Sequence, residues 1–258
     1  MAWSILLGIL FVAGTVGLTL ATYALIRRFA LAAGDSETKE LAASVAGRIS
    51  ALHGLILALV FAQEMIEYQQ LKFESSVEAN AIADIYFDIE RYDLAEARPV
   101  QDILYSYVKS IAGEEWDHLG ATGRLSPGTW GQWDEAYNAI LNLAPGNDRQ
   151  RSLRDNMLAR IHAVAETRVE RENHAGASVS MLFWFAAIAG VLFIALAYYS
   201  YPPKRVNLWL VSLYGAFTGL VLFFIYAFEN PYSAPGRMAP DAHIRLLEQL
   251  DRARGASG

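Results

Sequence analysis

Two ionisable residues, His53 and Glu64, lie in an otherwise apolar stretch of the chain. They are eleven residues apart, a distance of about three turns and roughly 16 Å along an α-helix, so they share one face. Leu57 and Val60 lie between them on that face. Polar rings separated by apolar rings are typical of an ion or proton path, which makes these four residues candidate pore residues. The alternatives are a single hydrogen bond from the imidazole to a neighbouring helix, or a contact face within a four-helix bundle.

No familiar arrangement of catalytic or metal-binding residues occurs in the sequence. It has no His-Glu-x-x-His, no Walker loop and no Gly-x-Gly-x-x-Gly after a strand. Its five histidines show no pair at helical spacing, and the chain has no cysteine, so neither a helix-borne metal site nor a thiolate nucleophile is expected. The net charge of −6 argues against nucleic acid as a partner. We therefore expect no enzyme, no cofactor and no bound metal.

The apolar residues are concentrated in long segments. Of 258 residues, 54% are hydrophobic and only 19% are charged, against about 25% charged in ordinary soluble domains. Three uncharged runs are each long enough to cross roughly 30 Å of hydrocarbon: 2–26, 174–201 and 206–228. A fourth stretch, 41–66, carries only Arg48 and Glu64 and is also predicted to cross. These patterns predict an all-α membrane protein with four transmembrane helices in a lipid bilayer.

The segment between spans two and three is acidic and has helical periodicity. It contains 19 Asp/Glu and 11 Lys/Arg. No proline occurs from Glu37 to Arg98, so the second span is expected to continue as one helix of roughly 55 residues. The helix before the third span meets no proline until Pro202 and is expected to run straight into that span. The predicted domains are transmembrane helices 1 and 2 (1–66), a water-exposed helical bundle (67–177), transmembrane helices 3 and 4 (178–230) and a tail with a short amphipathic helix (231–258).

Polar residues on the two extended helices are candidates for pairing across this bundle. They are Glu78, Asn80, Asp84, Arg160 and Arg168. Buried carboxylate–guanidinium pairs would hold the helices in register without doing chemistry. The alternative is a binding site that would also use two nearby tyrosines, Tyr86 and Tyr92.

Small residues in spans one and four indicate close helix packing. Gly215 and Gly219 form a GxxxG in span four, and span one repeats small residues every four positions. Such spacing lets helix backbones approach closely in lipid. Packing within one chain and packing between subunits are both open.

Basic residues near the spans predict the orientation. Six of them lie in the two short loops: Arg27, Arg28, Lys39, Arg48, Lys204 and Arg205. Because positive residues in short loops are retained in the cytoplasm, both loops should be cytoplasmic. The expected location is a bacterial inner membrane, with residues 67–177 on the extracytoplasmic side.

Several pieces of the chain together resemble one family. They are a leader span ending in Arg27-Arg28, a second span running through Leu52-His-Gly-Leu into Glu78-Ala-Asn80, a helical insert, and Glu229-Asn-Pro231 followed by Gly236. The pattern resembles the bacterial bestrophin-like membrane proteins, a domain family of unknown function. Such proteins commonly have Asp-Arg-Pro after the fourth span, where this chain has Glu-Asn-Pro.

The resemblance implies a functional hypothesis. Bestrophins proper are pentameric anion channels whose second span lines the pore, although this chain lacks a proline in that span and its predicted orientation is opposite to theirs. The leading hypothesis is a homo-oligomeric channel with the second helix nearest the axis. The alternative is a non-conducting scaffold, accessory subunit or sensory module that acts with an unidentified membrane protein partner.

Overall fold

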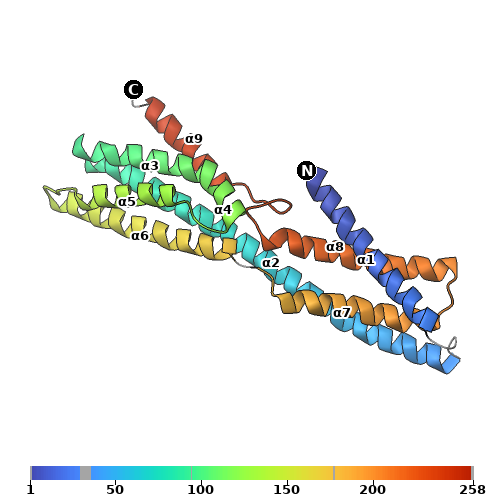
Figure 1. Cartoon of the computed structure of the whole chain (residues 1–258). Helices are drawn as coiled ribbons and strands as arrows, with labels where there is room; N and C mark the ends of the chain where they lie inside the picture. The colour runs from blue at the N-terminus through green and yellow to red at the C-terminus, as the bar shows by residue number, and fades with distance from the viewer. Residues whose placement is uncertain (1, 30–35, 94, 177, 257–258) are drawn as a thin grey trace. The chain divides into compact units, whose positions relative to one another are not determined.

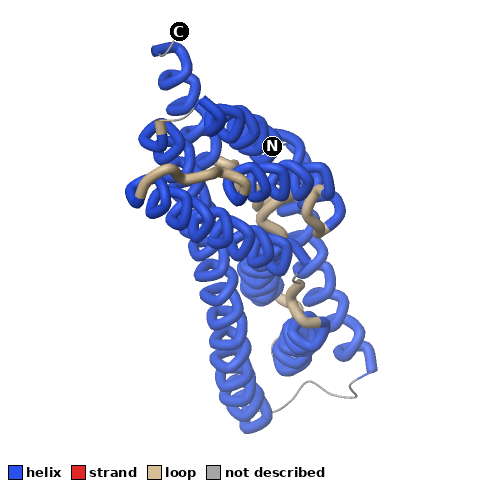
Figure 2. Tube along the Cα trace, turned by 90° about the vertical axis from the view of Figure 1, so that its left-hand side faces the viewer, coloured by secondary structure: helices blue, strands red, loops and turns tan. Residues whose placement is uncertain are grey.

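A computed structural model describes residues 2–29, 36–93, 95–176 and 178–256. The described residues form helices joined by loops and contain no strand (Figure 2). Four helical segments are long and apolar enough to cross a membrane, which confirms the predicted fold class. The chain divides into two compact units. We name them the membrane unit (Met1–Ile66 and Ser178–Glu229) and the bundle unit (Glu67–Ala177 and Asn230–Gly258).

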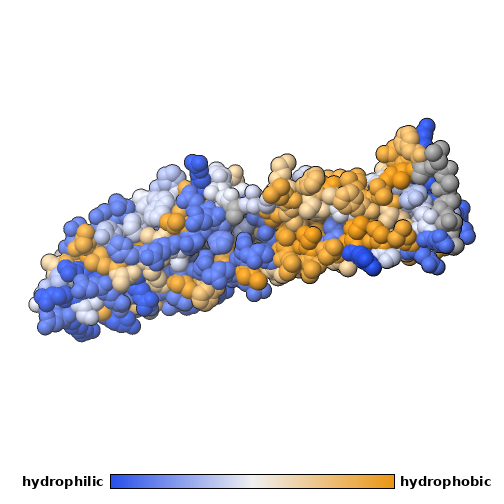
Figure 3. All heavy atoms as spheres, turned by 90° about the horizontal axis from the view of Figure 1, so that it is seen from below, coloured by the Kyte–Doolittle hydropathy of each residue, from blue (hydrophilic) through white to orange (hydrophobic). Residues whose placement is uncertain are grey.

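The membrane unit contains α1 (Ala2–Phe29), α7 (Met181–Ala197), α8 (Arg205–Glu229) and the first half of α2 (Ser36–Tyr92) (Figure 1). A short 3-10 turn, Tyr198–Ser200, follows α7. Large apolar side chains cover the outer surface of the membrane unit, as Figure 3 shows. Patches of this extent are unfavourable in water but match the hydrocarbon of a bilayer. The chain is therefore a multi-pass membrane protein.

Gly215 and Gly219 bring α8 against α1 within the same chain. A Cβ added at Gly215 would lie 2.8 Å from Thr19 Oγ1, and one added at Gly219 would lie 2.8 Å from the carbonyl oxygen of Phe11. The hydroxyl of Thr19 donates back to Thr15 O at 2.7 Å, so it stays satisfied on its own helix. The structure thus uses the GxxxG for packing inside one subunit.

The bundle unit packs the second half of α2 with α3 (Arg98–Ser110), α5 (Pro127–Leu141) and α6 (Asp148–Gly176) (Figure 1). Short elements connect them: Ala95–Ala97 (η1), the π-turn Ile111–Glu115 (η2) and α4 (Trp116–Thr122). The core is aliphatic and aromatic, and its fully buried members include Ile82, Ile85, Leu104, Val108, Ile161 and Val164. These residues recur at spacings of three and four, which is why one face of each helix is apolar.

The junction between α6 and α7 differs from the uninterrupted helix that the sequence predicts. α6 ends at Gly176 and α7 begins at Met181. The hydroxyl of Ser180 accepts a hydrogen bond from the backbone N–H of Leu182 at 3.2 Å, which is N-cap geometry. Serine hydroxyls compete with the helical backbone in this way, so the absence of proline does not guarantee a continuous helix. In contrast, α2 is a single helix of 57 residues, as expected.

The C-terminal segment, which the sequence suggests is a tail, packs into the bundle unit. It ends in α9 (Asp241–Ala256), whose Leu246 and Leu250 are buried. Before α9, the carbonyl of Met238 accepts a hydrogen bond from Trp116 Nε1 at 2.7 Å. A Cβ at Gly120 would lie 2.5 Å from the carbonyl oxygen of Tyr232, so this approach requires glycine. The C-terminal segment is therefore held against the bundle by backbone contacts before α9 and by apolar packing of α9 itself.

Candidate functional site

The bundle unit contains a group of ionisable side chains with almost no solvent exposure. We name it the buried-charge cluster, and its members are Glu78, Glu115, Arg168, Arg171, Tyr107 and His243. Each is 0–2% exposed. Charged side chains reach such depth only when they are paired, because an isolated buried charge is strongly unfavourable.

Glu115 is the central acceptor of the cluster. Its carboxylate receives Arg168 Nη2 and Arg171 Nη1, each at 2.9 Å. Burial raises the pKa of Glu115, and the Arg168 guanidinium acts against that rise. Glu78 forms an ion pair with Arg171 and accepts a hydrogen bond from the Tyr107 hydroxyl at 3.4 Å. Two carboxylates and two guanidiniums thus balance each other inside the bundle.

The cluster also includes aromatic rings that cover the guanidiniums. The carbon of the Arg168 guanidinium lies 4.5 Å from the ring centre of Trp130, and that of Arg171 lies 5.2 Å from the ring of Trp116. Cation–π contacts of this kind stabilise a cation that has left water. Burial lowers the pKa of Arg171 to about 10, which still leaves the side chain charged at neutral pH.

His243 of α9 joins the cluster to the groove between α2 and α9. Its Nε2 lies 3.1 Å from Glu78 Oε2, and its Nδ1 lies 3.3 Å from Ser75 Oγ. Burial and the nearby Arg171 and Arg168 lower the pKa of His243 well below its usual value, so the ring is neutral. Nε2–H therefore donates to Glu78, and Nδ1 accepts from the Ser75 hydroxyl.

Ser75, His243 and Glu78 are the residue types of a hydrolytic triad, but their environment differs. A general base works best when its pKa is near the operating pH, and the lowered pKa of His243 makes it a weak base. Glu78 is also neutralised by Arg171. We interpret the two hydrogen bonds, from Ser75 to His243 and from His243 to Glu78, as contacts that hold the Glu78 carboxylate and α9 in place.

The lowered pKa of His243 predicts a pH-dependent stability. Above about pH 6.5 the ring is neutral in both the folded and the unfolded chain. Below it the unfolded chain binds a proton that the fold excludes, so the free energy of unfolding should fall by up to about 1.4 kcal/mol per pH unit. Thermal unfolding of wild type and His243→Gln between about pH 7 and pH 5 checks this. The stability advantage of the wild type should shrink as the pH falls; a constant advantage would contradict the prediction.

His53 in the membrane unit holds three helices together. It is 4% exposed, its Nε2 lies 3.0 Å from the carbonyl oxygen of Ala187 on α7, and its Nδ1 lies 3.0 Å from the Tyr214 hydroxyl on α8. Nε2–H donates to the carbonyl, and Nδ1 accepts from the tyrosine. A Cβ at Gly190 would lie 2.2 Å from His53 Cδ2, so glycine leaves the space that the ring occupies.

The family of the chain follows from comparison with known sequences. The family model of the Bestrophin-like domain matches residues 13–242, which is most of the chain. The chain belongs to the bestrophin-like family. No curated protein and no solved structure shows significant similarity to it. The matched region contains both carboxylates and both arginines of the buried-charge cluster and ends just before His243.

The candidate pore face of this bestrophin-like chain lies against its own helices. Leu57 is buried in a cluster with Ala187, Leu222 and Ile225, and Val60 packs at the edge of that cluster. Glu64 is half-buried. Together with His53, Leu57 and Val60 form a contact face between α2 and helices α7 and α8 of the same chain, one of the arrangements that the sequence left open.

The candidate bundle residues of the bestrophin-like chain separate into two groups. Glu78 and Arg168 belong to the buried-charge cluster and meet through Tyr107, whose hydroxyl accepts from Arg168 Nη1 at 3.0 Å. Asp84 and Arg160 form a surface pair at 3.3 Å, with side chains 51% and 48% exposed. Asn80 is exposed beside α9, whereas two tyrosines considered with these residues, Tyr86 and Tyr92, are in the core.

Sequence reasoning missed Glu115, Arg171 and His243, although each of the three leaves a signal in the sequence. The buried residues of α6 follow one another at alternating spacings of four and three: Met157, Ile161, Val164, Arg168, Arg171 and Ala175. Glu115 comes four residues after the buried Ile111. A charge in an apolar stripe is a signal for a buried pair. His243 precedes the buried Leu246 by three residues and the buried Leu250 by seven, so it also occupies a core position of α9.

Proposed function

We propose that this bestrophin-like protein forms a homo-oligomeric ion channel in which the membrane part of α2 lies nearest the axis. A stripe of small side chains on the exposed face of α2 carries the proposal. It consists of Ser44, Gly47, Ala51, Gly54, Ala58 and Ala62, all exposed in the single chain. A Cβ at Gly47 or Gly54 would meet no atom within 4 Å. Helices pack closely through such stripes, or line a pore with them, when another subunit is present.

The rest of α2 supports this placement. The His53 face is already used inside the chain, so the small-residue stripe points elsewhere. In comparison, α8 exposes large side chains, such as Trp209 at 74% and Phe217 at 67% exposure. Arg48 is exposed beside the stripe at its beginning. A ring of such arginines would favour anions at one mouth of the pore.

A cysteine at Gly54 tests the assembly and the conduction together. Because the native chain has no cysteine, the Gly54→Cys protein should crosslink between subunits under mild oxidation. Its current in planar bilayers should also fall when a thiol-specific reagent is added. Phe217→Cys, on the exposed face of α8, is the matched control and should show neither effect. Silent bilayers from an intact oligomer would argue against conduction, and absent crosslinking would argue against α2 at the axis.

A second candidate function is a non-conducting sensory module or scaffold. The observation that favours it is a pair of cavities of about 320 and 370 Å³ along the groove between α2 and α9. This role would be favoured if a different protein is recovered with the chain from native membranes in a fixed ratio and if the purified protein gives no current in planar bilayers. Both proposals are non-enzymatic.

We further propose that the bundle unit lies outside the cytoplasm of a bacterial cell. Six basic residues in or beside the two short loops support this placement: Arg27, Arg28, Lys39, Arg48, Lys204 and Arg205. Ala144 is exposed in the loop between α5 and α6, so Ala144→Cys offers a labelling site. A membrane-impermeant thiol reagent should label it in intact spheroplasts. Labelling that appears only after lysis would reverse the orientation.

A further inference from the structure

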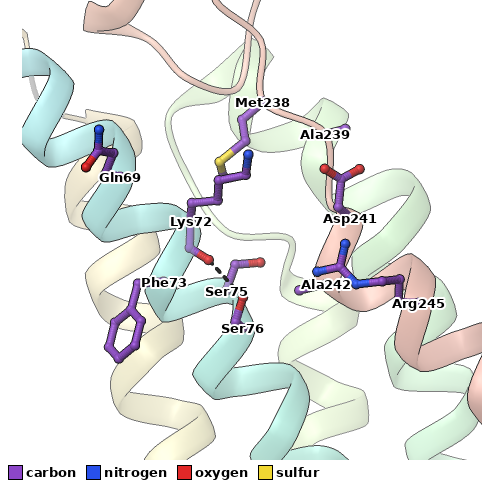
Figure 4. Close-up of a pocket in the computed structure, with 10 residues that line it drawn as sticks. All are labelled: Gln69, Lys72, Phe73, Ser75, Ser76, Met238, Ala239, Asp241, Ala242 and Arg245. Carbon is purple, nitrogen blue, oxygen red and sulfur yellow. Dashed lines mark hydrogen bonds between the residues drawn. The ribbon is translucent and has the colours of Figure 1, made fainter.

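A pocket of about 320 Å³ lies between α2 and the start of α9 (Figure 4). One wall is formed by α2, with Lys72 and Ser75, and the other by α9, with Asp241 and Arg245. Met238 closes one end. Liquid water takes about 30 Å³ per molecule, so the space is large enough for a small organic group.

Two cations that form no ion pair among the described residues extend into this pocket. Figure 4 shows the Lys72 ammonium and the Arg245 guanidinium reaching into the space from opposite helices. Among the described residues, neither side chain takes part in an ion pair, whereas Arg91, Arg160 and Arg237 in the same unit each do. Two such cations, one of them a planar fork of donors, suit an oxyanion such as phosphate.

The same pocket also presents acceptors. The Asp241 carboxylate lies in it beside Arg245, and the ion pairs of the described residues include none between these two side chains. Ser75 is 6% exposed, and its hydroxyl proton is directed to His243 Nδ1. Its oxygen lone pairs are therefore left as acceptors at the pocket wall. A ligand that satisfies all four groups carries an anionic group and a cationic donor close together.

We infer that this pocket binds a phosphoethanolamine group, with the phosphate held by Lys72 and Arg245 and the ammonium held by Asp241 and Ser75. The group occurs as a free zwitterion and as the head group of phosphatidylethanolamine. Lys72 follows Ile66 by six residues on the same helix, which is about 9 Å along α2. The exposed Phe73 is also one of the residues that line the pocket.

Calorimetric titration of the full-length protein in detergent micelles tests the recognition chemistry. Phosphoethanolamine should bind more tightly than inorganic phosphate or ethanolamine alone. Arg245→Gln and Lys72→Gln should each weaken its binding roughly tenfold or more, as expected for the loss of a charge-assisted contact. Asp241→Asn should weaken the binding of phosphoethanolamine but not the binding of inorganic phosphate. Arg252→Gln, two turns further along α9 and outside this pocket, is the matched control and should bind like wild type.

Native mass spectrometry from nanodiscs distinguishes the two sources of the group. The nanodiscs contain equal amounts of phosphatidylethanolamine and phosphatidylglycerol. If the lipid is the ligand, the wild type should retain phosphatidylethanolamine after release from them, and Arg245→Gln should not. Binding of free phosphoethanolamine without lipid retention supports a soluble ligand. The inference is overturned if neither form binds, or if Arg245→Gln and Asp241→Asn bind phosphoethanolamine like wild type. All these positions are exposed, so unchanged melting temperatures are expected and will show that the variants are folded.

Discussion

Replacement of Glu115 by Gln is expected to lower the free energy of unfolding by about 3–5 kcal/mol. The Glu115 carboxylate accepts from Arg168 and Arg171 at 2.9 Å each. Without it, two buried guanidiniums share only the charge of Glu78, and the cluster carries one uncompensated positive charge. The loss corresponds to a fall in melting temperature of roughly 6–20 °C, measurable by circular dichroism in detergent micelles.

Two further variants make the Glu115 result specific. Asp84→Asn breaks the exposed pair with Arg160 and should cost less than about 1 kcal/mol. The double variant Glu115→Gln/Arg168→Met restores charge balance and should recover part of the lost stability. If the melting temperature of Glu115→Gln equals those of Asp84→Asn and wild type, the buried-charge cluster does not hold the bundle together.

Substitution of Gly219 by Val is expected to separate α1 from α8 and to destabilise the membrane unit by about 3 kcal/mol. A Cβ at Gly219 would lie 2.8 Å from the carbonyl oxygen of Phe11 and 2.9 Å from the Cα of Val12. These are backbone atoms, so no side-chain rotation relieves the clash, and the helices must move apart. The measurement is thermal unfolding combined with size-exclusion chromatography in detergent.

Gly14→Val is the matched control, because a Cβ at Gly14 meets nothing within 4 Å. It adds the same side chain to α1, the helix that α8 contacts, and should leave the melting temperature close to wild type. Equal losses from the two substitutions would mean that added β-branching, and not the α1–α8 approach, causes the effect.

For the buried-charge cluster, sequence patterns predict which residues are buried but not which residues pair. On α2, Leu71, Ser75, Glu78, Ile82 and Ile85 follow the alternating spacing of a core stripe, so a polar pair at the second and third positions is expected to be buried. The same reasoning gives Arg168 from the stripe of α6. Spacing along one helix does not identify the partner on another, and Arg168 pairs with Glu115 rather than with Glu78 directly.

His53 and Glu64 show a second limit of the same kind. Helical periodicity predicts that they share one side of α2, but one helix can turn that side toward a pore, a neighbouring helix or lipid. The choice depends on Ala187, Gly190 and Tyr214, which surround the His53 ring in the fold and lie more than 130 residues away in sequence.

The membrane class, the four candidate spans, the all-α fold and the unbroken α2 could be predicted from the amino-acid sequence, because these depend on local hydropathy and on the absence of proline over the second helix. The break between α6 and α7, the docking of α9, and the balance of two carboxylates against two arginines became visible only in the folded structure. Each of these depends on contacts between distant segments, such as His243 with Glu78 and Val179 with Glu229. Because an unpaired polar group is unfavourable in the core, the polar side chains that become buried are those with a partner on another segment.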